Sequence, residues 1–320
     1  MLRRTPHTDE RRAAVNAQQS GFTRRGWLLF GAMALLWGVP YLFISIAVET
    51  ISPPAIVAGR TLIAALLLLP FALRSGALRA ALKHWPWVLA FGLVEMAGPF
   101  VLLGHAEMTL PSGMTGLLVA TVPLFAALIA LGSGDRGVLR PARGIGLLVG
   151  FIGVAIVVAG PGLFGGEVSL LAAGEVLLVA ILYAIAPFIV ARKLADVPSL
   201  GTITLSLLMI GIIYLPIGLL TQHQVPSVPS LFALLALAVI CTAVAFLAFF
   251  ALIREVGPVR APLFTYVNPV VAIVLGAIVL AEPLTPGLLL GFPLIIVGCW
   301  FAATGGRFRP AASLPLPPTP

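Results

Sequence analysis

The chain has 320 residues, of which 60% are apolar and only 9% are charged, and its mean hydropathy is +1.11. Soluble domains carry about 25% charged residues, so this composition excludes an ordinary water-soluble protein and predicts an all-α chain in lipid, where helices satisfy their own backbone hydrogen bonds. The formal net charge of +8 is compatible with nucleic-acid binding, but the basic residues lie between the hydrophobic segments. The lipid bilayer, and not nucleic acid, is therefore the expected partner.

Ten mostly apolar windows follow one another along the chain, each long enough to cross a hydrocarbon core of about 30 Å at about 1.5 Å per residue. The expected spans are 27–48, 55–73, 85–103, 113–131, 144–160, 170–190, 203–220, 231–251, 261–281 and 286–303. The flanking segments, residues 1–26 and 304–320, are expected to be disordered cytoplasmic tails, the first basic and the second rich in proline.

The basic residues predict the orientation of the spans, because short cytoplasmic loops accumulate Lys and Arg. All of the 19 except Arg60 lie in the N-terminal segment or in loops that follow the even-numbered spans. Both termini are therefore expected in the cytoplasm of a multi-pass protein of the inner or plasma membrane. Arg24 and Arg25 resemble part of a twin-arginine export signal, but the apolar run after them is too long for one, and they are interpreted as anchors of the first span.

The two halves of the chain, residues 27–160 and 170–303, are internally similar at an offset of 146 residues. The landmarks that come into register are Trp37 with Tyr183, Pro70 with Pro216, Phe100 with Phe246, and Pro123 with Pro269. Each half contains five expected spans, an odd number, so the halves must cross the membrane in opposite directions. Inverted repeats of this kind are typical of secondary transporters, which bind substrate near the midplane between the halves.

Several short motifs carry a resemblance to a known family. They are Trp37-Gly38, Pro53-Pro54 with Arg60, Ala106-Glu107, Pro111-Ser112-Gly113, Val122-Pro123-Leu124-Phe125, Thr242-Ala243-Val244-Ala245-Phe246, Asn268-Pro269-Val270, Ala281-Glu282-Pro283-Leu284-Thr285, and Gly291 with Gly298. Over residues 28–303 the chain resembles an EamA-type member of the drug/metabolite transporter superfamily. The resemblance implies ten transmembrane helices as two inverted five-helix EamA repeats, and a small-molecule substrate such as an amino acid or another metabolite, usually exported. Asp135 stands where the first repeat of this family often has Glu.

Ionisable residues at membrane depth are costly and are therefore functional candidates. Glu95 lies near the middle of the third expected span, and Arg60 lies about two turns inside the outer end of the second. Glu95 can serve as a proton or cation coupling site, contact substrate, form a structural ion pair with Arg60, or be a polar residue that faces water by chance. Arg60 can anchor the outer half of the bundle or clamp a substrate carboxylate. Glu175, His105 and Glu107 are expected at the wet interface.

Aromatic and polar side chains are expected to line a cavity for an amphipathic metabolite. The predicted substrate-binding residues are Trp37, Tyr41, Glu95, Phe100, Tyr183, Phe246, Tyr266 and Asn268. Pro40, Pro99, Pro187 and Pro269 predict kinks that free backbone carbonyls and open space in these spans. The alternative for each aromatic residue is packing against lipid or a neighbouring helix.

Other motifs weigh against enzymatic function. The aspartates lie in expected loops or tails, and no nucleophile elbow, His-rich metal pattern or phosphate-binding glycine loop is present, so we expect no enzyme, metal or other cofactor. Cys241 and Cys299 lie in apolar stretches and predict neither a disulfide nor a metal site. A membrane-embedded enzyme and a passive channel are the alternatives. Glycines four apart, at 146–150 and 287–291, indicate close helix contact, either within the protomer or in a homodimer.

Overall fold

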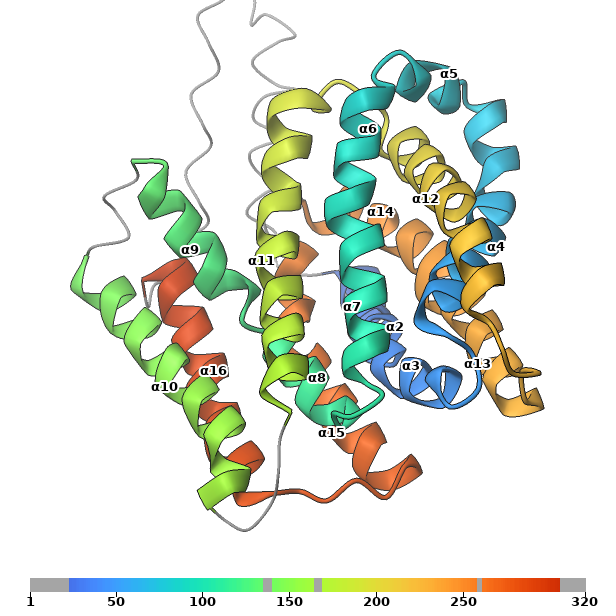
Figure 1. Cartoon of the computed structure of the whole chain (residues 1–320). Helices are drawn as coiled ribbons and strands as arrows, with labels where there is room; N and C mark the ends of the chain where they lie inside the picture. Colours follow the sequence, from blue (N-terminus) through green and yellow to red (C-terminus); the bar gives the residue numbers. More distant parts are fainter. Residues whose placement is uncertain (1–22, 135–139, 164–168, 258–260, 306–320) are drawn as a thin grey trace, which may run out of the picture.

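A computed structural model of the chain describes residues 23–134, 140–163, 169–257 and 261–305. All regular structure in these ranges is helical, and ten helical segments in them are long and apolar enough to cross a membrane (Figure 1). The predicted all-α class and the number of spans are confirmed. The tails and Asp135 lie outside the described residues.

Five crossings form the first repeat. Their elements are α2 (Arg24–Leu36) and α3 (Pro40–Val48) in the first crossing, α4 (Pro53–Arg74) in the second, α6 (Trp85–Gly92), η1 (Leu93–Ala97) and α7 (Gly98–Ala106) in the third, α8 (Ser112–Val119) and α9 (Val122–Gly132) in the fourth, and α10 (Pro141–Leu163) in the fifth. The short helix α5 (Ala77–Leu82) connects the second and third crossings. Helices α3 and α9 each have proline in their first two positions, where its missing N–H costs nothing.

The second repeat has the same plan. Its elements are α11 (Leu170–Lys193), α12 (Ser199–Thr221), α13 (Val228–Ala238), η3 (Val239–Val244) and α14 (Ala245–Val256), then η4 (Ala261–Tyr266), α15 (Asn268–Val279) and α16 (Pro286–Thr304). Pro187 lies inside α11, which is continuous, whereas Pro269 lies in the first turn of α15.

Hydrogen bonds between the repeats show that the second and seventh crossings run in opposite directions. The backbone N–H of Ser52, just before α4, donates to Gln222 Oε1 at 2.8 Å, just after α12. Thr50 Oγ1 accepts from the backbone N–H of Ser227, which precedes α13. The start of α4 therefore lies beside the end of α12, as inverted repeats require.

The irregular parts of the helices also follow the repeat. The two π-helical turns, η1 and η3, lie at corresponding places, since the offset of 146 carries residues 93–97 onto 239–243. The break between α8 and α9 likewise corresponds to the break before α15. The break between α2 and α3 has no counterpart, because α11 runs through the matching positions. π-helical turns inside α-helices are rare and frequently occur at functional sites.

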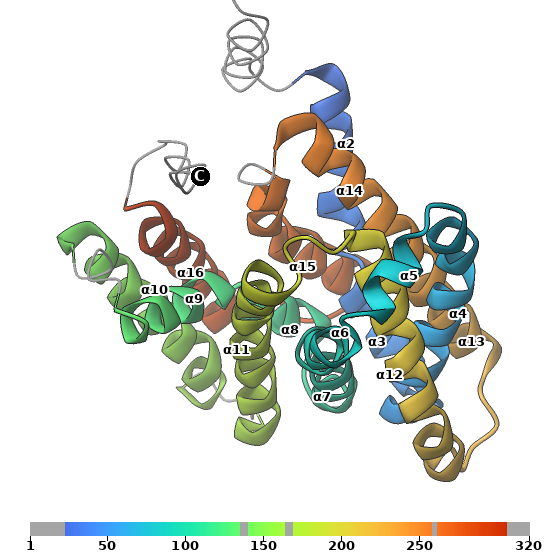
Figure 2. The same ribbon diagram turned by 90° about the horizontal axis from the view of Figure 1, so that it is seen from above.

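Helices α10 and α16 pack against each other at one edge of the bundle, away from α4 and α12 (Figures 1 and 2). Their glycines make this contact close. A Cβ atom added to Gly146 would lie 2.5 Å from the backbone nitrogen of Ala302, and one added to Gly298 would collide with the backbone of Gly150. The close contact predicted from the small residues is therefore made within the protomer.

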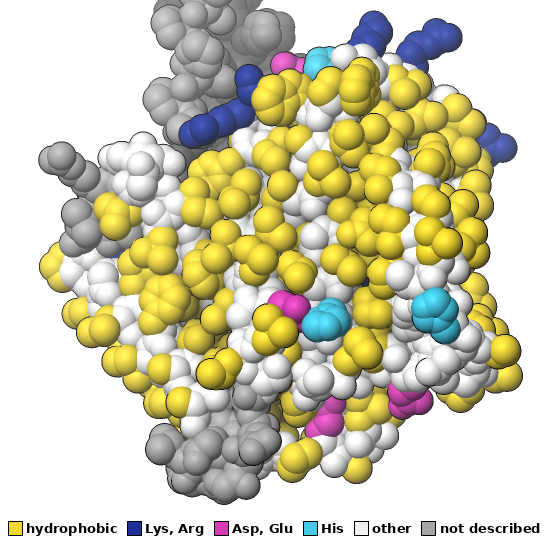
Figure 3. All heavy atoms as spheres, in the orientation of Figure 1, with side chains coloured by type: hydrophobic (Ala, Val, Ile, Leu, Met, Phe, Trp, Pro, Cys, Tyr) yellow, Lys and Arg dark blue, Asp and Glu magenta, His cyan; other side chains and the backbone are white. Residues whose placement is uncertain are grey.

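Apolar side chains cover most of the face seen in Figure 3. The Lys and Arg side chains coloured on this face lie along its upper edge, and the lower half carries Asp, Glu and His side chains. The Lys and Arg side chains on this face thus gather at one end of the bundle, in agreement with their positions in the loops that follow the even-numbered spans.

Candidate functional site

A cavity of about 260 Å³ lies inside the bundle, and side chains from both repeats line it. All the residues proposed from the sequence for substrate binding or coupling contribute to this lining: Trp37, Tyr41, Arg60, Glu95, Phe100, Tyr183, Phe246, Tyr266 and Asn268. They come from three crossings of the first repeat and three of the second. The structure therefore brings the predicted residues together; that they bind substrate stays a prediction.

Arg60 is almost completely buried, with 6% of its surface exposed, and it connects the two repeats. Its Nε donates a hydrogen bond of 2.8 Å to Thr242 Oγ1 in η3, and its guanidinium carbon lies 3.9 Å from the centre of the Phe100 ring. Thr242 Oγ1 in turn donates to the carbonyl of Leu237, five residues earlier. The π-helical turn thus presents a hydroxyl to the arginine, and the ring of Phe100 supplies a cation–π contact.

Glu95 lies in the other π-helical turn, η1, and it lines the same cavity as Arg60. Across the described ranges, the ion pairs join Arg25 to Glu255 and His105 to Glu175. The structural ion pair that the sequence allowed between Arg60 and Glu95 is therefore not formed in this conformation, because the guanidinium is directed to Thr242 and Phe100 instead. A cation and a carboxyl group share one cavity without neutralising each other.

Aromatic rings form one wall of the cavity around Trp37, which lies at the break between α2 and α3. Its ring centre lies 5.7 Å from that of Phe246, which also lines the cavity, at an interplanar angle of 79°, and 5.4 Å from that of Phe264, which is fully buried outside the lining. Asn268 begins α15, and with its amide nitrogen facing the acceptors it donates to the carbonyls of Ala34 and Phe264 at 3.2 and 3.1 Å. The amide thus holds the two interrupted crossings together beside the wall.

Sequence reasoning missed two polar residues at the cavity. Cys241, for which the sequence predicts neither a disulfide nor a metal site, is buried and lines the cavity, and Thr242 accepts the hydrogen bond of Arg60 beside it. The internal repeat could have identified Cys241, because the offset of 146 residues aligns it with Glu95.

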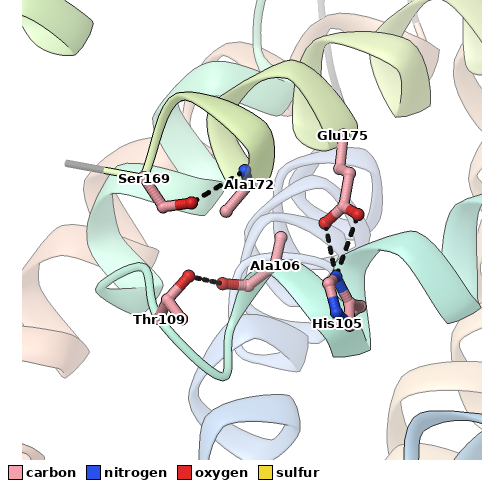
Figure 4. A network of polar contacts seen from close by, with 6 residues as sticks. All are labelled: His105, Ala106, Thr109, Ser169, Ala172 and Glu175. Atoms are coloured by element: carbon pink, nitrogen blue, oxygen red, sulfur yellow. Dashed lines mark hydrogen bonds and ion pairs between the residues drawn. The ribbon is translucent and has the colours of Figure 1, made fainter.

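His105 and Glu175 form an ion pair between the end of α7 and the start of α11 (Figure 4). Nδ1 of His105 lies 2.9 and 2.8 Å from the two carboxylate oxygens, and 55% of the histidine side chain is exposed. The exposed His105 agrees with the predicted wet interface, whereas only 15% of the Glu175 side chain is exposed. Because α7 and α11 belong to different repeats, this pair joins the repeats beyond the cavity.

Glu107 does not lie at the wet interface, and that prediction is wrong. Only 5% of its surface is exposed, and neither carboxyl oxygen has a hydrogen-bond partner among the described residues. The residue follows directly after α7, near Ser45 of α3 and Glu282 of the segment after α15. Burial, and then the nearby carboxylate of Glu282, raise the pKa of Glu107 well above its ordinary value.

Comparisons with known proteins agree with this architecture. The chain is 29% identical to "Uncharacterized inner membrane transporter YedA" of Escherichia coli K12 over 325 residues, covering 90% of this chain and 95% of that protein. It is also 29% identical to "Uncharacterized transporter YvbV" of Bacillus subtilis 168 over 296 residues, covering 90% of this chain and 94% of that protein.

A solved structure titled "Crystal structure of protein" superposes with a TM-score of 0.61 over 87% of this chain and 96% of that one; at 22% identity this likeness shows the fold alone. The model of the EamA-like transporter family matches residues 24–159 and 170–304, which together are most of the chain. This multi-pass membrane protein is a transporter and belongs to the EamA-like transporter family.

Proposed function

We propose that this transporter is a secondary exporter of the inner membrane, with both termini in the cytoplasm, that moves a small zwitterionic, amphipathic metabolite such as an amino acid. The family and the inverted repeat support transport by alternating access. The names of both relatives support transport, and the name of YedA also supports the inner membrane. The segregation of Lys and Arg to one end supports the orientation.

One observation carries the choice of substrate: Arg60 and Glu95 face the same cavity and are not paired with each other. An uncompensated charge inside a membrane protein is costly. A zwitterion satisfies both groups at once, with its carboxylate on the guanidinium and its ammonium group on Glu95. Thr242 occupies only Nε of Arg60, which leaves the terminal nitrogens for the substrate.

The size and walls of the cavity narrow the substrate further. Its volume of about 260 Å³ is below the range of roughly 300–1,000 Å³ typical of pockets for drug-sized ligands. The aromatic wall around Trp37 suits an apolar side chain on the substrate. A compact metabolite with one charged and one apolar end fits these features better than a large drug or an inorganic ion.

Alternating access requires helices that can bend where the substrate sits. The π-helical turns η1 and η3 and the breaks before α9 and α15 lie at matching positions of the two repeats, and all four adjoin the cavity. Rocking of one repeat against the other around these points would open the cavity to each side in turn.

Counterflow into proteoliposomes tests the proposal. Vesicles with the purified chain, loaded with an unlabelled amino acid, should take up the same labelled compound with saturable kinetics. Candidates are screened as a panel of zwitterions, with the corresponding amines and carboxylic acids as controls. A passive channel would give flux without saturation or counterflow, and an enzyme would release a chemically changed compound, which mass spectrometry of the vesicle contents detects.

A further inference from the structure

The segment after α15 places a carboxylate from the second repeat on a helix of the first. Ala281 adopts a left-handed conformation with φ of 53°, which is uncommon for a residue with a side chain, and this turn directs Glu282 toward α8. Glu282 accepts hydrogen bonds from the backbone N–H groups of Ser112 at 2.7 Å and Gly113 at 3.0 Å. Both oxygens of Glu282 thus accept hydrogen bonds at the N-terminus of α8, where negative charge is favoured.

Glu107 lies in the same region and has the opposite character. Its two oxygens are buried and have no hydrogen-bond partner within the described part of the chain, and neither ion pair found there involves it. The buried hydroxyl of Ser112 is also unpartnered. Two carboxyl groups therefore lie close together: Glu282 is half-buried and accepts two backbone hydrogen bonds, whereas Glu107 is buried and its oxygens have no such partner.

The elements packed around Glu107 provide little that could neutralise it. Helix α3 contributes the phenol of Tyr41 and the backbone amide of Ser45, α8 carries no titratable side chain, and the segment after α15 contributes Glu282. Helices α4 and α11 also pack against α7, but Arg60 of α4 is directed to Thr242 and Phe100, and Glu175 of α11 is paired with His105. The charged group that acts on Glu107 is Glu282, which has the same sign.

We propose that Glu107 is a proton-binding site, occupied by a proton in the conformation seen here while Glu282 carries the negative charge. Two neighbouring carboxyl groups cannot both ionise cheaply, and the proton goes to Glu107, which is buried, because Glu282 is half-buried and accepts two backbone hydrogen bonds. The raised pKa of Glu107 agrees with this assignment. A metal cation is disfavoured, because hard cations require several oxygen ligands and both oxygens of Glu282 already accept backbone hydrogen bonds.

The consequence of losing the proton concerns the contact between the repeats, and this part of the proposal rests on the proposed transport function. Helices α8 and α15 pack closely, since a Cβ atom added to Gly116 would lie 2.6 Å from that of Ala272. A second negative charge beside Glu282 would repel the carboxylate that fastens this contact. Proton release at this end would therefore loosen the first repeat from the second and couple a proton to the transport cycle.

Infrared difference spectroscopy of the purified full chain in lipid nanodiscs tests proton binding without any substrate. We expect the band of a protonated carboxyl group at pH 7 that is lost in Glu107→Gln and kept in Glu49→Gln, which alters an exposed glutamate in the loop between α3 and α4. The spectrum of Glu95→Gln shows how much of this band comes from the carboxyl group of Glu95 in the cavity. In Glu282→Gln, where the repelling charge is gone, the Glu107 band should titrate at least about one pH unit lower.

Identical bands in the wild type and Glu107→Gln would overturn the proposal. Disappearance of the band on adding sodium chloride, but not choline chloride, at constant pH would also overturn it in favour of a sodium site. Glu107→Gln mimics the protonated side chain and is expected to fold. If it does not fold, the lower titration pH of the Glu107 band in Glu282→Gln tests the proposal by itself. The spectroscopic measurement needs no transport, so the two proposals fail separately. A proton at Glu107 without counterflow would reject the proposed function but not the proton-binding site. Counterflow without a proton at Glu107 would reject the proton-binding site but not the proposed function.

Discussion

Nε of Arg60 donates a 2.8 Å hydrogen bond to Thr242 Oγ1, which joins the second crossing of one repeat to the π-helical turn of the other. In a regular α-helix the hydroxyl of Thr242 would donate to the carbonyl four residues earlier. In this π-helical turn it donates to the carbonyl of Leu237, five residues earlier. The irregular turn therefore directs the hydroxyl that fixes the position of the guanidinium in the cavity.

Arg60→Lys keeps the positive charge but loses the planar group that holds a carboxylate through two hydrogen bonds. We expect KM for a zwitterionic substrate to rise on the order of tenfold or more, while KM for the corresponding amine without a carboxylate is unchanged. Counterflow of both compounds measures this, with Arg79→Lys on the exposed surface as the control. Equal loss for both compounds would mean that Arg60 only anchors the bundle.

Glu95→Gln tests the other end of the substrate. If the carboxyl group receives the ammonium group, this variant should weaken transport of the zwitterion but not of the corresponding acid, which has no amine. A variant that binds the zwitterion normally, and has lost only its response to an imposed pH gradient, would instead assign proton coupling to Glu95. Substrate binding to the purified protein, measured by calorimetry beside counterflow, separates these outcomes.

Hydropathy and basic residues were sufficient to predict the spans, because lipid imposes length and composition on each crossing. They did not predict the break after Trp37 or the two π-helical turns, since neither changes the apolar character of a segment, although the kinks expected at Pro40 and Pro99 lie beside that break and beside η1. The internal repeat found the cavity residues, because symmetry places equivalent positions around one axis. The sequence predicts Glu107 at the wet interface because the residue lies near the end of a span. Its position in the sequence does not reveal that the segment at Glu282 folds over it.

Topology can be tested with reporters fused in the loops. Fusions after Arg79, Arg140, Lys193 and Arg254, and in both tails, should all report cytoplasm, since these loops hold the basic residues. A fusion after Glu49 or Gln222, whose loops are hydrogen bonded to each other through Ser52 and Thr50, should report the opposite side. An extracytoplasmic signal from either terminus would contradict the inverted ten-helix topology.

Cysteine substitution tests whether the cavity holds substrate. The background replaces Cys241 and Cys299, and the tested positions are Trp37, Phe100, Tyr183, Phe246, Tyr266 and Asn268. Each introduced cysteine should react with a small polar thiol reagent, and substrate should protect it, because these side chains line the cavity. Leu237→Cys is the matched control, since Leu237 is fully buried in the core and does not line the cavity. Uniform inertness of all six, with intact counterflow, would place the transport path elsewhere.

The raised pKa of Glu107 makes stability depend on pH. Because its folded pKa lies well above the ordinary 4.5, the folded protein holds a proton that the unfolded chain releases, so the stability that this group contributes is fully present below about pH 4.5 and is lost as pH rises through the folded pKa. The slope contributed by one proton is at most about 1.4 kcal/mol per pH unit. Thermal unfolding in detergent across this window should show a falling Tm in the wild type and in Glu49→Gln, and a flatter profile in Glu107→Gln, which cannot ionise. Parallel profiles for all three proteins would show that Glu107 ionises as easily in the folded protein as in water.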